Sequence, residues 1–253
     1  MAAAMPFDLS GRTALVTGAN KGIGQAIALA LAAAGADIVA AGRSAAQETG
    51  DRVRKAGRQF LDVSADLSGT SQVSRVAKEA LALSGRIDIL VNNAGTIRRA
   101  EAADYSREDW DLVLGTNLSS VFFLTQVIAA PMLERGSGKI INIASMLSFQ
   151  GGARVAAYTA SKSAVAGLTR ALANEWAGKG LNVNAIAPGY VATDNTQALR
   201  DDAQRSREIL GRIPQGRWAA PEDMGGAAVF LASSASDYVN GAIIPVDGGW
   251  LAR

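Results

Sequence analysis

The strongest constraint on the fold is a regular alternation of short β-branched runs with longer stretches of helical periodicity. Seven runs have the length and composition of strands, at residues 13–17, 37–41, 59–64, 87–93, 139–145, 181–187 and 242–248. Helical patterns occupy residues 24–35, 71–85, 109–133 and the segment after Tyr158. Strands that alternate with helices form a parallel sheet with helices on both faces. The sequence therefore predicts an α/β fold with a doubly wound parallel sheet of about seven strands.

The length and composition favour one domain over residues 1–253. Hydrophobic residues make up 49% of the chain but aromatic residues only 6%, so the apolar mass is mainly aliphatic, as in buried parallel strands. The segment from Tyr190 to Pro221 is polar and has an irregular sequence pattern. Long insertions of this kind commonly cover a binding site, so we expect a substrate lid around residues 190–221.

Two residue types are missing, and their absence removes several kinds of chemistry. The chain has no cysteine and no histidine, which excludes disulfides, cysteine nucleophiles, a Ser-His-Asp triad and the commonest metal ligands. We therefore expect no metal site, and any general acid or base must be Asp, Glu, Lys or Tyr.

The charge and hydropathy patterns favour a cytoplasmic protein. The net charge is +2 without a basic stripe, so we expect no nucleic-acid partner. The longest apolar run, Ala26 to Ala36, is shorter than the roughly 20 residues of a membrane span. The first residues also lack the basic region of a signal peptide, so we expect no membrane partner.

A glycine-rich loop, "TGANKGIG", follows the first predicted strand and precedes an amphipathic helix. Glycine there permits a tight turn, close approach of the backbone to a phosphate and close packing of helix on strand, while the helix N-terminus attracts the pyrophosphate. This position distinguishes a nucleotide site from a generic strand–helix turn. We predict a Rossmann-type dinucleotide site with cofactor contacts from Gly18, Asn20, Lys21, Gly22, Ile23 and Gly24.

The end of the second predicted strand indicates which dinucleotide is preferred. An NAD-selective site has a carboxylate there, but this chain has Gly42 followed by Arg43. Arginine suits a 2′-phosphate, and Lys21 would place a second positive charge nearby. The alternative is that Arg43 is a solvated cap of the next helix. We predict NADP as the preferred cofactor, with NAD as the alternative.

The segment "YTASK" places Tyr158 and Lys162 four residues apart, on one face of a helix. An ammonium beside a phenol favours the phenolate and so lowers the phenol pKa, which makes tyrosine a usable acid and base. Ser145 ends the fifth predicted strand and could polarise a substrate oxygen. Asn117 lies in the middle of a helical pattern, where it either holds a water that relays protons towards Lys162 or satisfies a local carbonyl. The alternative for the pair itself is an ordinary exposed helix start.

Two further polar segments follow predicted strands. Asp66 comes after the third strand and either caps the next helix or accepts a hydrogen bond from an adenine amine. The segment "NNAG", Asn92 to Gly95, ends the fourth strand at the carboxyl edge, where ligands of such sheets bind. Its asparagines have an equally good structural role in joining loops.

These motifs, taken in order with "PGYVAT", resemble the classical short-chain dehydrogenase/reductase family over essentially the whole chain. The resemblance implies that Tyr158 is the acid/base and that Lys162 assists it and holds the nicotinamide ribose. It also implies that Ser145 orients the substrate and that Asn117 anchors a relay water. Further cofactor contacts implied by the resemblance are Asp66, Leu67, Asn93, Ala94, Gly95, Pro188, Gly189, Val191 and Thr193.

Within that family the chain is most similar to the 2-dehydro-3-deoxy-D-gluconate 5-dehydrogenase group, also described as 2-deoxy-D-gluconate 3-dehydrogenases, through segments such as "NNAGTIRRAE", "KIINIASMLSFQGG" and "VDGGWLAR". This implies hydride transfer between a nicotinamide cofactor and a secondary hydroxyl or ketone of a sugar acid, of the 3-deoxy-2-ketogluconate or gluconate type. A carboxylate substrate needs a cation, ideally an arginine. The candidate cations are Arg98, Arg99 and Arg154, with Gln150 for hydroxyls and Trp218 or Trp250 for a sugar face.

Two other functions stay open at this point. One is reduction of another carbonyl, such as a 3-oxoacyl thioester or a neutral polyol ketone, by the same catalytic set. The other is a non-catalytic nucleotide-binding regulator. The family resemblance further implies a homotetramer, built partly through the helices that carry Asn117 and Tyr158.

Overall fold

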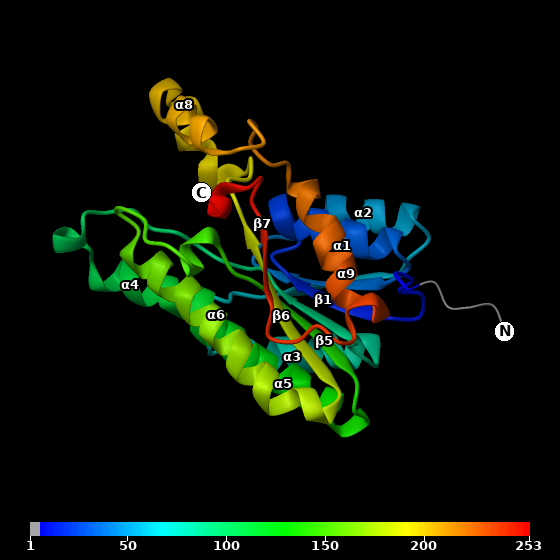
Figure 1. Ribbon diagram of the computed structural model, residues 1–253. Helices are drawn as coiled ribbons and strands as arrows, with labels where there is room; N and C mark the ends of the chain where they lie inside the picture. The colour runs from blue at the N-terminus through cyan, green and yellow to red at the C-terminus, as the bar shows by residue number, and fades with distance from the viewer. Residues whose placement is uncertain (1–5) are drawn as a thin grey trace.

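A seven-stranded parallel sheet forms the centre of the computed structural model, which describes residues 6–253 (Figure 1). The strand order is β3-β2-β1-β4-β5-β6-β7, and every neighbouring pair is parallel. The strands are β1 Thr13–Thr17, β2 Asp37–Gly42, β3 Phe60–Ser64, β4 Ile89–Asn92, β5 Gly138–Ile143, β6 Leu181–Pro188 and β7 Ile243–Val246. The order reverses between β1 and β4, which is the switch point where doubly wound sheets bind ligands. The predicted fold class is confirmed.

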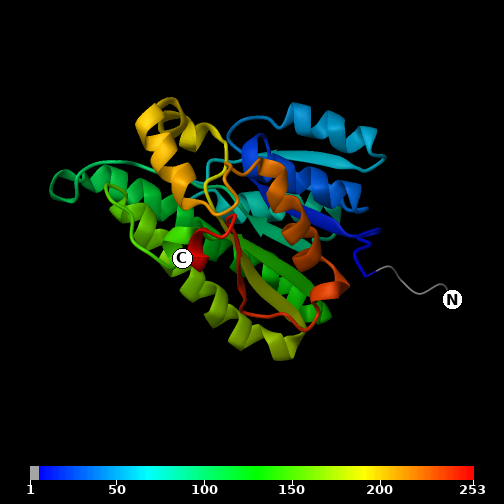
Figure 2. The same cartoon turned by 45° about the horizontal axis from the view of Figure 1, so that its top comes forward.

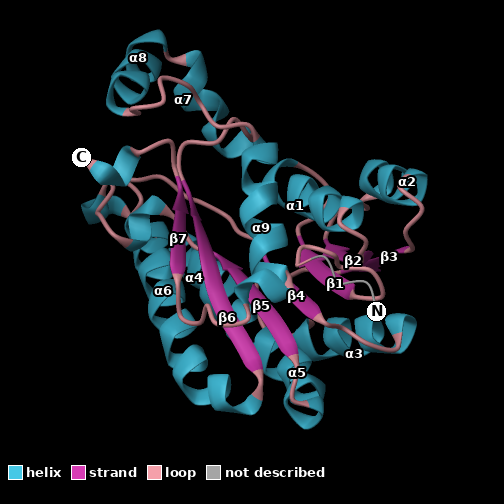
Figure 3. Ribbon diagram, turned by 45° about the vertical axis from the view of Figure 1, so that its right-hand side comes forward, coloured by secondary structure: helices cyan, strands magenta, loops and turns pink. Residues whose placement is uncertain are grey.

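Helices cover both faces of the sheet (Figure 3). On one face lie α1 Gly22–Ala33, α2 Gln47–Lys55 and α9 Gly225–Ala232. On the other lie α3 Val73–Ser84, α5 Ser120–Arg135 and α6 Ala156–Trp176. The sequence patterns for α1, α3, α5 and α6 predicted these helices; α2 and α9 were not predicted.

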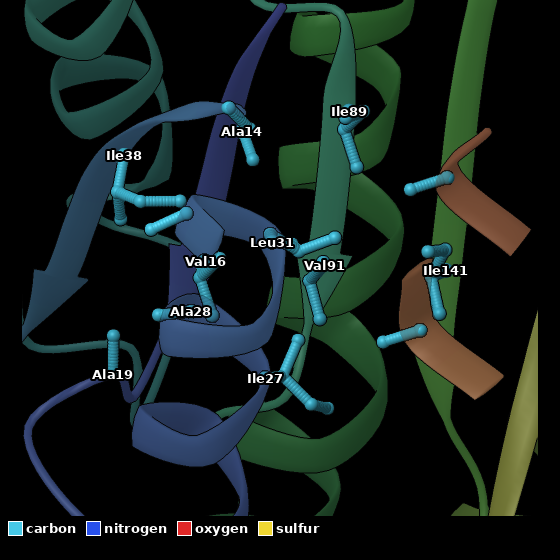
Figure 4. Close-up of a cluster of buried hydrophobic side chains, with 14 of the residues drawn as sticks. Ala14, Val16, Ala19, Ile27, Ala28, Leu31, Ile38, Ile89, Val91 and Ile141 are labelled. Carbon is cyan, nitrogen blue, oxygen red and sulfur yellow. The ribbon is translucent and has the colours of Figure 1, made fainter. Parts of the chain in front are cut away.

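The strands divide their side chains between two cores because successive residues point to opposite faces. Val16 and Val91 pack against Ile27 and Leu31 of α1, as Figure 4 shows. Leu15, between Ala14 and Val16, belongs instead to the core under α3, α5 and α6. Both cores are built almost entirely from aliphatic residues, which explains how a chain with few aromatic residues buries a two-sided sheet.

One long helical segment, Arg107–Arg135, is interrupted at its middle. It consists of α4 Arg107–Leu114, a π turn at Gly115–Ser119 and α5. By length and mean hydropathy it is apolar enough to span a membrane. Here, however, Leu124, Ile128 and Met132 of α5 are fully buried against the sheet, which is the environment of a core helix.

The polar segment from Tyr190 to Pro221 is not irregular, and that part of the prediction was wrong. It contains α7 Gln197–Asp201 and α8 Ala203–Arg212, and α8 is capped by the carboxylate of Asp202, which accepts from two backbone N–H groups. Figures 1 and 2 show α8 outside the layers formed by the sheet and its covering helices. Because only Ile209 of α8 is buried, this helix carries little hydrophobic signal in its sequence.

Candidate active site

A cleft of about 620 Å³ opens at the carboxyl edge of the sheet, at the switch point between β1 and β4. It is bordered by the glycine loop, the ends of four strands, the start of α6 and the segment after β6. The predicted residues that line it are Gly18, Asn20, Lys21, Gly22, Ile23, Gly24, Arg43, Asp66, Leu67, Asn93, Ala94, Gly95, Arg98, Tyr158, Lys162 and Thr193.

The glycine loop depends on the absence of side chains. Gly18 and Gly22 have φ angles of +68° and +57°, which L-residues with a Cβ rarely adopt. A Cβ on Gly24 would lie 2.2 Å from the carbonyl oxygen of Gly18. The first residues of α1 therefore sit directly against the end of β1, and the helix N-terminus points into the cleft. This cradle fits the pyrophosphate of a dinucleotide.

Lys21 lines the cleft but has a carboxylate partner, so its charge is not free for a 2′-phosphate in this structure. Its ammonium pairs with the carboxylate of Asp194, and both side chains are largely exposed. Thr193, the neighbour of Asp194, packs against Gly22: its Cγ2 lies 3.5 Å from the position that a Cβ on Gly22 would occupy. The segment after β6 is thus joined to the glycine loop across the cleft.

Arg43 lines the cleft beyond β2 and is exposed. Within residues 6–253 it forms no ion pair, and it is four residues before the first residue of α2. Asp66 accepts a hydrogen bond from the N–H of Ser68, and this bond is the main reason that its pKa is lowered. Asp66 does not cap α3, which begins at Val73, so its carboxylate remains part of the cleft wall.

The side chains of the two asparagines of "NNAG" both make structural hydrogen bonds. The Asn92 side chain is buried and donates to Thr125 of α5 and Asn142 of β5, at 2.9 and 2.8 Å. Asn93 donates to the carbonyl of Thr17 at 2.9 Å while also lining the cleft. The structural role that the sequence left open is therefore present, and only Asn93 also faces the cleft.

Tyr158 and Lys162 lie side by side in the first turns of α6, with Nζ of the lysine 5.6 Å from the centre of the tyrosine ring. Burial raises the pKa of Tyr158, against the opposing effects of a hydrogen bond with Ser145 and the charge of Arg99. Lys162 donates to the carbonyl of Ile143 at 2.6 Å, and burial lowers its pKa to about 8. The pKa of Tyr158 is therefore raised and not lowered as expected, because burial outweighs the two groups that lower it: the Ser145 hydroxyl, through a hydrogen bond, and Arg99, through its charge. Lys162 is not one of these groups.

Ser145 is held in place at the end of β5 by its own loop. Its hydroxyl accepts from the N–H of Leu147 at 3.1 Å, and its N–H donates to the hydroxyl of Ser148. Ser148 in turn donates to the carbonyl of Lys162 at 2.7 Å. This loop thereby fixes Ser145 against the helix turn that carries Tyr158 and Lys162.

The π turn explains the asparagine in the middle of a helical pattern. Asn117 is fully buried, accepts from the N–H of Thr96 at 2.8 Å and donates to the carbonyl of Thr96 at 2.9 Å. It also donates to Ser161, which donates to the carbonyl of Tyr158 at 2.8 Å. The side chain thus connects the loop after β4 to the turn of α6 that bears Tyr158. The carbonyl that it satisfies belongs to Thr96, 21 residues away, and not to its own helix, and the relay water stays a prediction.

Four predicted substrate residues are engaged by other groups. Arg98 pairs with Asp109, and Arg154 pairs with Glu101, each at 3.1 Å. Gln150 accepts from Arg212 at 3.3 Å, and Trp218 packs edge-on against Tyr190.

Trp250 is 4% exposed, under the guanidinium of Arg212, so it has no face open to a sugar. Arg99 differs from the neighbouring arginines. Its only hydrogen bond among the described residues goes to the carbonyl of Asn195, and its charge acts on Tyr158.

Some of the predicted cofactor residues do not line the cleft, and some of the residues that line it were not predicted. Pro188, Gly189 and Val191 lie at and after the end of β6; Gly189 packs against Asp247, and Val191 is buried. The lining residues that were missed are mostly apolar or small and carry no chemical signal: Gly42, Ser44, Ala65, Ser68, Thr96, Leu112, Thr116, Ile143, Ala192, Asp194, Asn195 and Pro221. Ser148 and Ser161 were also missed, although Ser161 lies inside "YTASK".

Comparison with known proteins gives matches that span nearly the whole chain. A family model described as enoyl-(acyl carrier protein) reductase matches residues 18–251. The 2-dehydro-3-deoxy-D-gluconate 5-dehydrogenase of Dickeya dadantii is 58% identical over 248 residues, which cover 98% of each chain.

Two solved structures share both the fold and much of the sequence. A protein from Agrobacterium tumefaciens with bound NADP, provisionally described as a 2-deoxy-D-gluconate 3-dehydrogenase, is 58% identical with a TM-score of 0.93, covering 98% of this chain and 99% of that one. A gluconate 5-dehydrogenase from Burkholderia cenocepacia, in complex with NADP and tartrate, is 42% identical with a TM-score of 0.93 and 98% coverage of both chains.

Proposed function

Because the chain belongs to the short-chain dehydrogenase/reductase family, we propose that it is an NADP-dependent oxidoreductase that interconverts a secondary hydroxyl and a ketone on a sugar acid. The observation that carries this proposal is the cleft that brings the glycine loop, Tyr158 and Lys162 together at the sheet edge, with Arg99 close enough for its charge to act on the phenol. The relatives named for 2-dehydro-3-deoxy-D-gluconate and gluconate support the substrate class.

The backbone N–H groups and side chains at the cleft suit NADP. The N-terminus of α1 and the glycine loop hold the pyrophosphate, and Arg43, with no carboxylate at the end of β2, holds the 2′-phosphate. Asp66 receives the adenine amine, and Lys162 and Asn93 hold the nicotinamide ribose. When bound, the nicotinamide ring accepts or supplies the hydride. NADP in two structural relatives supports this preference over NAD.

Tyr158 moves the proton. Burial keeps its phenol protonated near neutral pH, so in reduction it donates a proton to the oxygen of the ketone. In oxidation it removes the proton of the hydroxyl, and the hydrogen bond of Ser145 and the charge of Arg99 stabilise the phenolate that this requires. Ser145 also holds the substrate oxygen. Asn117 fixes the turn of α6 through Ser161 and thereby the position of the phenol.

Arg99 is the residue that binds the substrate carboxylate. Arg98 and Arg154 each have a carboxylate partner at 3.1 Å, whereas Arg99 donates only to a backbone carbonyl in the described chain. It acts electrostatically on Tyr158, so a substrate whose hydroxyl reaches the phenol can place a carboxylate near the guanidinium. The lid, residues 190–221, contributes Asn195 to this contact and closes over the sugar.

The test is a steady-state assay with NADP and NAD, using aldonates, 3-deoxy-2-ketoaldonates, neutral polyols and a 3-oxoacyl thioester. We expect turnover on the acids, with NADP more efficient than NAD. Loss of a charge-assisted hydrogen bond predicts that Arg99→Gln raises KM for the acid about 10-fold or more. The matched variant Arg154→Gln should leave that KM nearly unchanged.

Each component of the proposal has its own negative result. Turnover confined to the polyol or the thioester would refute the sugar-acid assignment and leave the reaction type intact. Equal effects of Arg99→Gln on acid and polyol would refute the carboxylate role. The thioester is the second candidate substrate, favoured by the description of the matching family model. Tight NADP binding without any turnover would support the non-catalytic regulator.

The assembly we propose is a cytoplasmic homotetramer, in which α5 and α6 pair with a second copy. Phe123 of α5 is 42% exposed although it lies in an apolar helix, and the outer side of α6 carries small residues such as Ala160 and Gly167. Sedimentation of the purified protein tests this assembly, and Phe123→Lys should shift it towards smaller species. A monomer at micromolar concentration would contradict it.

A further inference from the structure

A cluster of three arginines lies at the edge of the sheet opposite the cleft. Arg12 immediately precedes β1, and Arg86 and Asp88 precede β4, the neighbouring strand. Arg135 is the last residue of α5, which returns to the same edge. The three guanidinium groups all approach one carboxylate, that of Asp88. None of these residues has a role in the proposed reaction.

The carboxylate of Asp88 cannot satisfy three guanidinium groups. Its side chain is 4% exposed, and its Oδ2 already accepts from the N–H of Thr13 at 3.1 Å. The other oxygen, Oδ1, is 2.6 Å from Nε of Arg86 but 3.5 Å from Arg12 and 3.8 Å from Arg135. Only Arg86 therefore makes a short ionic hydrogen bond, and the other two arginines lie at the limit of an ion pair.

The cluster has an excess of positive charge. Three arginines and one aspartate leave a local charge of +2, and the described chain places no second carboxylate within ion-pair distance of these arginines. Burial, together with the charges of Arg86 and Arg12, lowers the pKa of Arg135, although Asp88 opposes this effect. Nε of Arg135 is buried and has no hydrogen-bond partner among the described residues. The excess positive charge, which also acts on Arg135, favours an additional anion. Arg135 contributes mainly its charge, because its Nη2 donates to the carbonyl of Ile87.

We propose that Arg12, Arg86 and Arg135 form a binding site for a small doubly charged oxyanion, either inorganic phosphate or the phosphoryl group of a phosphomonoester. The side chains of Arg12 and Arg86 are 48% and 53% exposed, so their remaining N–H donors are open to a ligand from solvent. Planar guanidinium groups bind phosphate oxygens in pairs of hydrogen bonds, and a dianion balances the charge of +2. The site is separate from the cofactor cleft because it lies at the amino ends of β1 and β4.

The experiment measures the melting temperature in increasing phosphate at constant ionic strength, with NADP saturating so that the glycine loop is blocked. A ligand at about ten times its Kd should raise the melting temperature of a chain this long by about 3 °C. Arg12→Gln and Arg86→Gln should each lose at least about half of this shift. Arg107→Gln is the matched control, because Arg107 is 88% exposed and within residues 6–253 its ion-pair partner is Asp111 alone.

The variants also separate specific binding from the general stabilising effect of phosphate. Phosphate stabilises proteins in general by exclusion from their surface, and this effect is the same in all variants. Equal shifts in wild type, Arg12→Gln and Arg86→Gln would therefore overturn the proposal. If Arg86→Gln does not fold, Arg12→Gln decides alone, because its 3.5 Å contact contributes little to folding.

A second measurement identifies the source of the anion. Broadening of the ³¹P resonance of inorganic phosphate and of glycerol 2-phosphate is compared at equal concentration, with NADP again saturating. Stronger broadening of the ester would assign the site to phosphorylated metabolites, and stronger broadening of phosphate would assign it to the free ion. Absence of broadening for both, in wild type, would contradict the site.

Discussion

The two walls of the cleft are built on different principles. The inner wall, formed by the glycine loop and the start of α6, is fixed by close packing and by buried groups such as Lys162, which is 5% exposed. The outer wall, the segment from Tyr190 to Pro221, packs Ile209 and Ile213 against Trp250 in a small apolar cluster, but its contact with the glycine loop is the exposed pair Lys21–Asp194. Contacts between exposed charges contribute little free energy each, whereas a buried overlap is costly. The inner wall therefore fixes geometry, and the contact between the two walls can break at low cost.

The largest effect should come from removing the phenol of the inner wall. In Tyr158→Phe the ring is kept but the proton donor is lost, so kcat should fall about 10²–10⁴-fold. The NADP Kd, measured by fluorescence titration, should stay within about twofold. Tyr238→Phe is the control, since Tyr238 is fully exposed. A Tyr158→Phe enzyme that keeps a tenth of its kcat would show that another group moves the proton.

The second-largest effect should come from filling the space between the glycine loop and the first turn of α1. In Gly24→Ala the new Cβ would overlap the carbonyl oxygen of Gly18, at 2.2 Å. Overpacking of about 1–3 kcal/mol should weaken NADP binding about 10- to 100-fold by displacing the loop. The control is Gly226→Ala, because a Cβ at this exposed position in α9 meets nothing within 4 Å. Equal NADP affinities in the two variants would show that the glycine loop can shift without loss of cofactor binding, so that the inner wall does not fix the geometry.

The smallest effect should come from the contact between the walls. Asp194→Asn frees Lys21 and removes a negative charge, so NADP should bind up to about fivefold more tightly, while Lys21→Gln should weaken binding by a similar factor. In the double variant the two effects should not add, because each single change breaks the same pair. Glu208→Gln, which breaks the Arg205–Glu208 pair on α8, is the control. Additive effects would mean that the pair does not join the walls.

The inner wall is also the part that the sequence predicted well. The glycine loop, Tyr158 and Lys162 are local motifs: the three glycines fall within seven residues, and the pair within five. Their geometry follows from backbone rules that act over one turn. The seven strands were predicted for the same reason, since each is a short aliphatic run.

The parts that sequence could not predict depend on residues far apart in the chain. Arg98 and Arg99 are adjacent, but one is held by Asp109 and the other by the backbone of Asn195. The pKa of Tyr158 depends on how deeply α6 is buried, which no local pattern reports. Helix α8 was missed because its only buried residue is Ile209, so its sequence reads as solvent-exposed loop.

The π turn at Gly115–Ser119 has a consequence for how the chain tolerates changes in length. In an α-helix each residue advances the helix by about 100°, and a π turn accommodates one additional residue. Loss of one residue here would restore a continuous α-helix and keep the faces of α4 and α5 in phase, because the π turn is what absorbs that residue. The bulge that brings Asn117 to Thr96 and Ser161 would be lost. A single deletion in this turn should therefore preserve the packing of α5 on the sheet while removing the hydrogen bonds of Asn117.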